Sequence, residues 1–128
     1  MRANRKRDTG PELRLRTHLH GLGLRYQLGR RIATTPPVIP DLVFLRAKVA
    51  VFVDGCFWHG CPIHGVQPRV NSAYWFAKIL LNKRRDQTVD QNLIGLGWLA
   101  IRIWEHEDPR EAAARVKSIV RSHAAIDT

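Results

Sequence analysis

Apolar positions along this chain fall into short β-branched runs and into longer stretches with helical spacing. Residues 42–45 and 49–53 are two such runs, and residues 46–48 between them are few enough for a hairpin turn. Residues 24–28 alternate apolar and polar positions, and residues 98–104 form a later apolar run. The pattern therefore predicts four strands, and the two that are joined by residues 46–48 should be antiparallel.

Helical spacing first occurs near residue 9. Thr9 can cap a helix, Pro11 fits its first turn, and Glu12 completes a capping box. Gly21 and Gly23 mark the end of this predicted helix. Its apolar face consists of Leu13, Leu15, Leu19 and Leu22.

Two further helices are predicted. One begins at Ser72 and runs to about Leu93, and the polar segment 84–92 leaves open whether it is broken or tilted. The other follows Asp108, an acidic N-cap residue, and runs to about residue 122. The inner stripe of the helix that begins at Ser72 is predicted to be Trp75, Ile79 and Leu80.

The resulting order is α, β, ββ, α, β, α, which predicts an α/β fold with a mixed central sheet flanked by helices. A chain of 128 residues with 45% hydrophobic and 25% charged residues is expected to form one globular domain over residues 1–128. No apolar run approaches the roughly 20 residues of a membrane span. We therefore expect a cytosolic protein with no membrane partner.

The charge of the chain points to a class of partner. The formal net charge is +10. Within residues 1–31, nine Lys or Arg face two acids, Asp8 and Glu12, and nine minus two leaves +7. A second basic cluster consists of Lys78, Lys83, Arg84 and Arg85. Nucleic acid is the favoured partner, and a solvated basic face or an anionic lipid surface are the alternatives.

Residues 55–71 predict an irregular loop that holds both cysteines of the chain. A loop of this length without secondary structure is usually functional or tied by a metal. It offers three zinc ligands, Cys56, Cys61 and His64. A structural zinc site needs four, and we nominate His106, just past the last predicted strand, with His59 as the alternative. Without zinc, the cysteines would be buried apolar thiols and the histidines surface residues.

Two carboxylates fall on the same edge of the predicted sheet. Asp41 precedes the first strand of the hairpin, and Asp54 ends the second. Carboxylate and carbonyl oxygens suit Mg²⁺, which a nuclease uses to activate water. His59 could act as a general base. The alternatives are that Asp41 only begins a strand, that Asp54 belongs to a turn, and that Glu12 only caps a helix.

The chain resembles the very short patch repair (Vsr) mismatch endonucleases over roughly residues 3–107. The matches occur in order and comprise residues 7–12, Pro40-Asp41, residues 52–62, Tyr74-Trp75 with Asn82 and Asp86, residues 96–98, and Trp104-Glu105. The resemblance implies a fold similar to that of PD-(D/E)xK restriction endonucleases with a bound zinc. It also implies an enzyme of the bacterial cytosol or nucleoid that nicks one DNA strand at a T:G mismatch left by deamination of 5-methylcytosine. We expect it to act as a monomer.

The same resemblance implies roles for individual residues. Asp41 would be the principal Mg²⁺ ligand, together with the backbone carbonyl of Val53. His59 would be the general base, oriented by Asp86, and Glu12 would act in the outer sphere of the metal. The zinc positions of the family fall on Cys56, Cys61, His64 and His106.

DNA contacts are implied in the same way. Phe57, Trp58 and Trp75 would be wedges that unstack the duplex beside the mismatch, where a base step costs least to open. The other expected DNA-binding residues are Lys78, Asn82, Arg84 and Arg85.

The sequence departs from the family pattern at several points. Position 54 carries Asp where some members carry His, and His stands at two zinc positions where relatives can have Cys. The strand that ends at Val53 lacks the second acid and the lysine of generic PD-(D/E)xK sites. The family usually has a further N-terminal segment that grips DNA, so we expect either a truncated chain or a minimal member. Two alternative functions are a zinc module that only binds nucleic acid, and a restriction or defence nuclease without mismatch preference.

Overall fold

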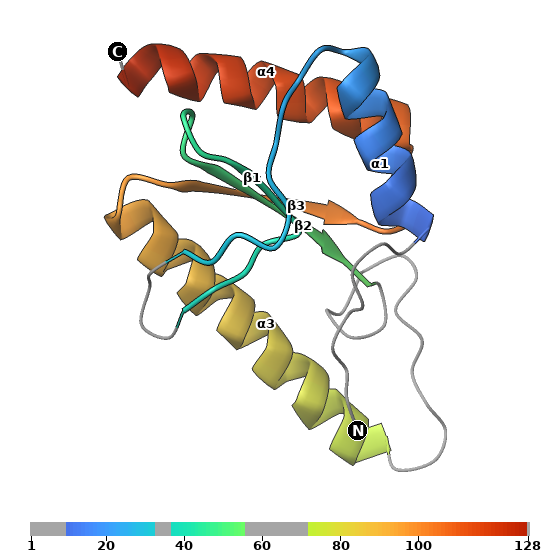
Figure 1. Ribbon diagram of the computed structural model, residues 1–128. Coiled ribbons are helices and arrows are strands. Elements are labelled where there is room, and N and C mark those ends of the chain that lie inside the picture. Colours follow the sequence, from blue (N-terminus) through green and yellow to red (C-terminus); the bar gives the residue numbers. More distant parts are fainter. Residues whose placement is uncertain (1–9, 33–36, 56–71, 128) are drawn as a thin grey trace.

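The computed structural model describes residues 10–32, 37–55 and 72–127, which form a three-stranded sheet with helices on both faces (Figure 1). The elements in chain order are α1 (Gly10–Gly21), β1 (Leu42–Phe44), β2 (Val49–Asp54), α3 (Ser72–Gly95), β3 (Leu99–Trp104) and α4 (Pro109–Asp127). Helices α1 and α4 cover one face of the sheet, and α3 covers the other (Figure 1). The predicted mixed α/β architecture is confirmed.

Strand β2 lies at the centre of the sheet. It pairs with β1 in antiparallel fashion, with Leu42 opposite Val51, and with β3 in parallel fashion, with Val53 opposite Ile103. Every residue of β2 is buried, because helices cover both of its faces. This explains why the strand reads as a continuous apolar run rather than as an alternating one.

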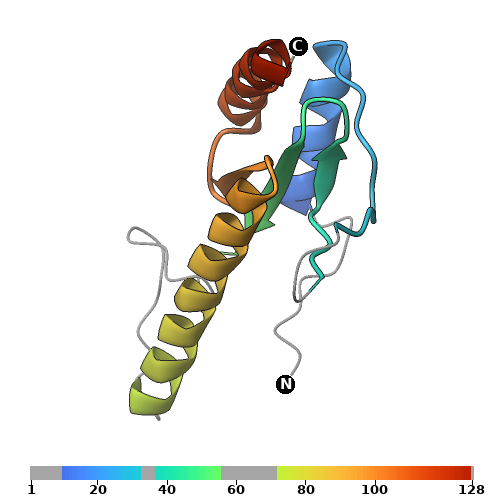
Figure 2. The ribbon, with the colours of Figure 1, turned by 90° about the vertical axis from the view of Figure 1, so that its left-hand side faces the viewer.

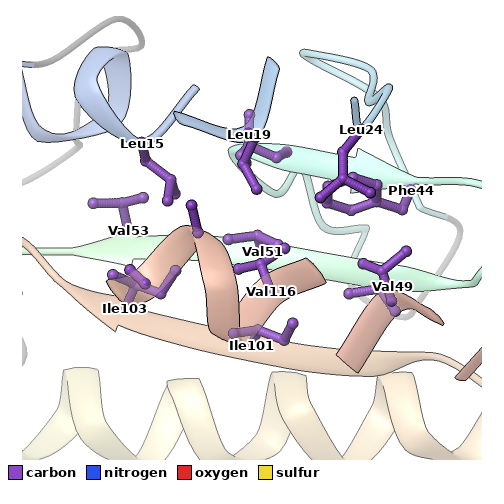
Figure 3. Packing of buried hydrophobic residues seen from close by; sticks show 14 of the residues in the cluster. Leu15, Leu19, Leu24, Phe44, Val49, Val51, Val53, Ile101, Ile103 and Val116 are labelled. Atoms are coloured by element: carbon purple, nitrogen blue, oxygen red, sulfur yellow. The ribbon is translucent and has the colours of Figure 1, made fainter. Parts of the chain in front are cut away.

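The larger core fills the space between the sheet and the helices α1 and α4 (Figure 3). Leu15 and Leu19, four residues apart, point from one face of α1 toward the sheet. Val49, Val51 and Val53 meet them from alternate positions of β2. Helix α4 contributes Ala112, Ala113, Val116 and Val120. Its small alanines allow close approach to its neighbours.

A smaller core lies on the opposite face, under α3. Ala50 and Phe52 of β2 meet Leu93 of α3 there, and Ile32 and Val38 close the cluster. The alternation along β2 thus sends successive side chains to different cores. The first half of α3 extends past the carboxyl ends of β2 and β3 (Figures 1 and 2).

Two predicted elements are corrected by the structure. Residues 24–28 do not form a strand, since only Gln27 pairs with Val43 in an isolated bridge. Leu24 packs into the larger core instead, and Gly29 adopts a φ of 64°, which turns the chain away. The predicted inner stripe of α3 is also wrong at Leu80, which is 43% exposed, because the helix has left the sheet at that point.

The other predicted helices and strands are confirmed, with small shifts at their ends. Helix α3 is continuous to Gly95, so the polar segment 84–92 does not break it. The predicted N-cap of α4 is present: the backbone N–H of Arg110 donates to Asp108 Oδ1 at 2.8 Å. Thr9, the predicted cap of α1, lies outside the described residues. In the described part of the chain, no helix has both the length and the apolar character to cross a membrane.

Replacement of Leu19 by alanine tests the larger core. Leu19 is fully buried, so the Leu19→Ala variant should lose about 2–5 kcal/mol of unfolding free energy through lost burial and the cavity left behind. Leu13→Ala in the same helix is the matched control, because Leu13 is 43% exposed and should cost no more than about 0.5 kcal/mol. Urea unfolding followed by circular dichroism measures both. Equal losses would contradict the assigned core.

Candidate active site

The carboxylate of Asp41 is fixed at the carboxyl end of β2. The backbone N–H of Asp41 donates to the carbonyl of Val51 at 3.0 Å, which continues the β1–β2 ladder by one residue. Asp41 Oδ2 accepts a hydrogen bond from the backbone N–H of Val53 at 2.8 Å. The side chain is partly buried. The structure thus brings together Asp41 and Val53, the two residues that the family resemblance assigned to Mg²⁺.

Glu12 lies in the first turn of α1 and is completely buried. Arg16, one turn later, places Nη1 3.1 Å from Glu12 Oε2. This cation stabilises the buried carboxylate, since an ionised group without a nearby counter-charge is costly in the interior. The first turns of α1 lie against the ends of β2 and β3, where Pro11, Val53 and Trp104 border a space of about 10 Å³. Glu12 therefore belongs to the same end of the sheet as Asp41.

Asp54 and Asp86 both form ion pairs with Arg102, a residue that was not predicted from the sequence. Arg102 of β3 points to the face of the sheet that α3 covers, and its Nη1 lies 3.3 Å from both carboxylate oxygens of Asp54. The same nitrogen is 3.5 Å from Asp86 Oδ1 of α3. Asp54 is only 3% exposed. Its alternation with Val53 along β2 places the carboxylate on the α3 side of the sheet.

Asp90 holds the other side of the guanidinium. Arg102 Nε donates to both oxygens of Asp90, at 3.1 and 3.2 Å, and Nη2 donates to Asp90 Oδ1 at 2.8 Å. The guanidinium also lies over the ring of Phe52, 4.2 Å from its centroid. Burial lowers the pKa of Arg102, but the hydrogen bond with Asp90 and the charges of Asp54 and Asp86 outweigh it, so its pKa is raised above the ordinary value.

Two sequence features could have revealed this cluster. Arg102 stands between Ile101 and Ile103 in an apolar run that forms a strand of a buried sheet, where a charge needs partners. Asp86 and Asp90 are four residues apart, so they lie on the same side of a helix. The sequence does not connect Arg102 with its partners. Only the pairing of β3 with β2 under α3 brings Arg102 next to Asp54, Asp86 and Asp90.

The residues expected to bind DNA on α3 differ in exposure. Trp75, Lys78 and Asn82 are partly buried, whereas Arg84 and Arg85 are exposed. The ring of Trp75 contacts that of Tyr74 edge to face, with centroids 5.2 Å apart. Trp75, Lys78 and Asn82 belong to the first half of α3, which extends past the sheet (Figure 2), and Arg84 and Arg85 follow directly after it.

Most of the expected zinc site and the general base lie outside the described residues. These are Cys56, Cys61, His64 and His59, together with the expected wedges Phe57 and Trp58. Among the residues that the structure does describe, no three His, Cys, Asp or Glu side chains form a group that could hold a metal ion.

His106 is the one nominated zinc ligand in the described part of the chain. It is exposed in the turn after β3. The neighbouring Glu105 donates its backbone N–H to the carbonyl of Asp54 at 3.0 Å, so the end of β3 runs beside the end of β2. Cys56 follows Asp54 by two residues. Two thiolates and two imidazoles are a donor set that suits zinc, and the position of His106 fits it.

The donor set around Asp41 suits a different ion. A carboxylate held by a backbone N–H, next to a strand-end carbonyl, offers the oxygen ligands that Mg²⁺ prefers. The residues at this end of β2 therefore fit a hard divalent cation.

Comparison with known proteins extends these observations. The sequence model of the family described as DNA mismatch endonuclease Vsr matches residues 1–64. The type II nicking enzyme V.NaeI of Lentzea aerocolonigenes is 49% identical over 118 residues, which are 91% of this chain and 71% of that protein. The type II nicking enzyme V.XorIIP of Xanthomonas oryzae pv. oryzae is 37% identical over 94% of this chain and 88% of its own. The DNA mismatch endonuclease Vsr of Escherichia coli (strain K12) is 36% identical over 82% of this chain and 66% of its own.

Proposed function

Because the chain belongs to the Vsr family of DNA endonucleases, we propose that it nicks one strand of duplex DNA at T:G mismatches in very short patch repair. The observation that carries this proposal is the hydrogen bond of Asp41 Oδ2 with the N–H of Val53. It fixes a carboxylate at the strand end where the resemblance puts the Mg²⁺ ligands. A carboxylate held next to a strand-end carbonyl favours a metal-dependent nuclease over a module that only binds DNA.

Asp41 and the carbonyl of Val53 would hold the Mg²⁺ ion. When bound, this ion supplies Lewis-acid activation and neutralises negative charge on the scissile phosphate. His59 would accept the proton of the attacking water at an imidazole nitrogen, and neutral imidazole suits this work near pH 7. Glu12, buried beside Arg16, would add negative charge near the cation without touching it.

Cys56, Cys61, His64 and His106 would hold a structural zinc ion. A closed set of four protein ligands leaves no open position for substrate, so the role of this ion would be to fold the loop. The turn after β3 runs beside the end of β2, which supports this assignment. The loop would then present Phe57 and Trp58 to the DNA.

The basic surface and the aromatic residues would divide the work of DNA binding. Arg84 and Arg85 are exposed on α3 and would contact the phosphate backbone, which gives affinity without sequence information. Lys78 and Asn82 would do the same on the part of α3 that extends past the sheet. Trp75 would join the two loop aromatics as a wedge, and weak stacking at a mismatch would lower the cost of insertion.

A second candidate is a nicking enzyme that recognises a DNA sequence without requiring a mismatch. The names of several relatives favour it, because V.NaeI and V.XorIIP are called type II nicking enzymes with no mention of a mismatch. The catalytic residues would be the same in both cases. Only the substrate separates the two candidates.

A nicking assay on duplexes that share one sequence and differ at a single base pair tests the proposal. We expect cleavage of the T-containing strand of a T:G duplex at least about tenfold faster than that of the C:G duplex, since about 1.4 kcal/mol less opening cost gives this factor. Uracil-containing and abasic duplexes show whether weak stacking alone suffices. Single-turnover rates with strand-specific labels, with Mg²⁺ and without, are the measurement. Equal rates on T:G and C:G duplexes of the same sequence would support the second candidate instead.

A further inference from the structure

Arg102 joins two carboxylates at the end of the sheet, those of Asp54 and Asp86. It comes from the middle of β3, Asp54 comes from the end of β2, and Asp86 comes from α3. Nη1 of Arg102 lies 3.3 Å from the Asp54 oxygens and 3.5 Å from Asp86 Oδ1. One guanidinium nitrogen therefore bridges two acids from different elements.

The guanidinium is itself held from its other side. Asp90 binds Nε and Nη2, and Nη2 also donates to the backbone carbonyl of Asp86 at 3.4 Å. The ring of Phe52 lies 4.2 Å below the guanidinium carbon and fixes its plane. Asp90 thus holds the guanidinium of Arg102 in place. In this position Nη1 points to the carboxylates of Asp54 and Asp86. Lysine could not reproduce this, because its point charge lacks the planar fork of donors.

Charge explains why the two acids need this bridge. Asp54 is 3% exposed and lies next to a second carboxylate, so without Arg102 two like charges would meet in a poorly solvated place. Each would then move away from the other toward water. Arg102 therefore contributes to the positions of both carboxylates.

The bridge also lies where α3 leaves the sheet. Asp86 precedes Val89 by one turn, and Val89 and Leu93 pack on the smaller core. N-terminal to this point the helix extends past the sheet (Figures 1 and 2). The ion pairs of Arg102 therefore add to the contacts of Val89 and Leu93 in anchoring α3 next to the half that carries Trp75.

Resting on the proposed nuclease function, we propose that Arg102 is a positioning residue for strand cleavage: it holds Asp86, with Asp54, in place at the carboxyl end of β2. Arg102 does not itself contact the reacting atoms. It would act through Asp86, which by the family resemblance would orient the general base His59, and through α3, which carries the proposed DNA contacts.

The test compares Arg102→Met with Asp90→Asn. Arg102→Met keeps an apolar stem on Phe52 and removes the charge, so single-turnover nicking at saturating enzyme should fall about 10- to 100-fold, the scale of small misplacements in active sites. Asparagine at position 90 still offers its side-chain oxygen to Nε and Nη2 of Arg102. Asp90→Asn therefore removes one charge from the cluster but keeps Arg102 and its Nη1 pairs in place, and it should nick within about threefold of the unaltered protein. Equal losses in both variants would overturn the inference, because general loosening of the cluster would then explain them.

A double-variant cycle with Asp86→Asn separates positioning from stability. If Arg102 acts through Asp86, Arg102→Met should change the nicking rate less than about threefold in the Asp86→Asn background, because coupled residues are not additive. Undiminished loss in that background would contradict the inference. Each variant is assayed below its unfolding temperature, so that loss of folded protein does not enter the rate.

A second readout needs no nicking. Hydrogen exchange of the α3 amides N-terminal to Asp86 should be at least about tenfold faster in Arg102→Met and less affected in Asp90→Asn. If the unaltered protein does not nick DNA, the proposed function fails. The exchange experiment still tests whether Arg102 positions α3 in that case. Unchanged exchange of these amides in Arg102→Met would overturn the positioning role.

Discussion

Asp41→Asn should lower the rate of strand nicking by at least about 100-fold while the fold stays intact. Asparagine keeps a side-chain oxygen that can accept the N–H of Val53, the bond that Asp41 makes at 2.8 Å. It loses the negative charge that the proposed Mg²⁺ ion requires. Metal ions supply several kcal/mol of transition-state stabilisation, and about 2.7 kcal/mol corresponds to a factor of 100.

The measurement is the single-turnover rate on a T:G duplex in Mg²⁺, together with the unfolding temperature and the affinity for DNA. Asp108→Asn is the matched control, because Asp108 caps α4 on the surface and asparagine caps a helix about as well. This control should nick within about twofold of the unaltered protein. Retention of nicking in Asp41→Asn would show that Asp41 is not the principal ligand.

Removal of zinc should have the second largest effect. We expect one zinc ion per purified chain, and we expect Cys61→Ala to lose it, because three ligands do not complete a structural site. If the affinity places free zinc about 1,000-fold above its dissociation constant, the ion contributes about 4 kcal/mol to the free energy of unfolding. The loop with Phe57, Trp58 and His59 would lose its order, so nicking should disappear as well.

Zinc content by atomic emission and urea unfolding with and without a chelator measure this effect, with Mg²⁺ restored before activity is assayed. His18→Ala is the control, since His18 lies on α1 and belongs to no nominated metal site. It should keep both zinc and activity. A purified protein free of zinc yet active would show that the four nominated residues are not a zinc site.

Local patterns in the sequence predicted most of the elements. Strand β2 was found because it is apolar from Val49 to Val53. The start of α4 was found because Asp108 and Pro109 combine two helix-start signals. Residues 24–28 were predicted wrongly as a strand. Alternation was correct for Leu24 and Tyr26, which pack on the larger core, but not for Leu28, which is exposed. A strand also needs a partner along its length, and the isolated bridge of Gln27 with Val43 is the pairing that the structure describes there.

The candidate site was also predicted only in part. Asp41 and Val53 were assigned from the resemblance, and the hairpin register brings them together. Asp54 was expected on the same edge of the sheet as Asp41, and it does end β2. Its carboxylate, however, faces α3 and lies on Arg102, because successive residues of a strand point to opposite faces.

The order of apolar runs, helix signals and motif residues was sufficient to give the mixed sheet, its flanking helices and the acidic end of the hairpin. These features depend on contacts within a few residues or on a periodicity of two or 3.6. The cluster of Arg102 with Asp54, Asp86 and Asp90 depends on three segments that only folding brings together. The sequence shows that the charge of Arg102, within an apolar strand, needs partners. The parallel pairing of β3 with β2 under α3 determines that these partners are Asp54, Asp86 and Asp90.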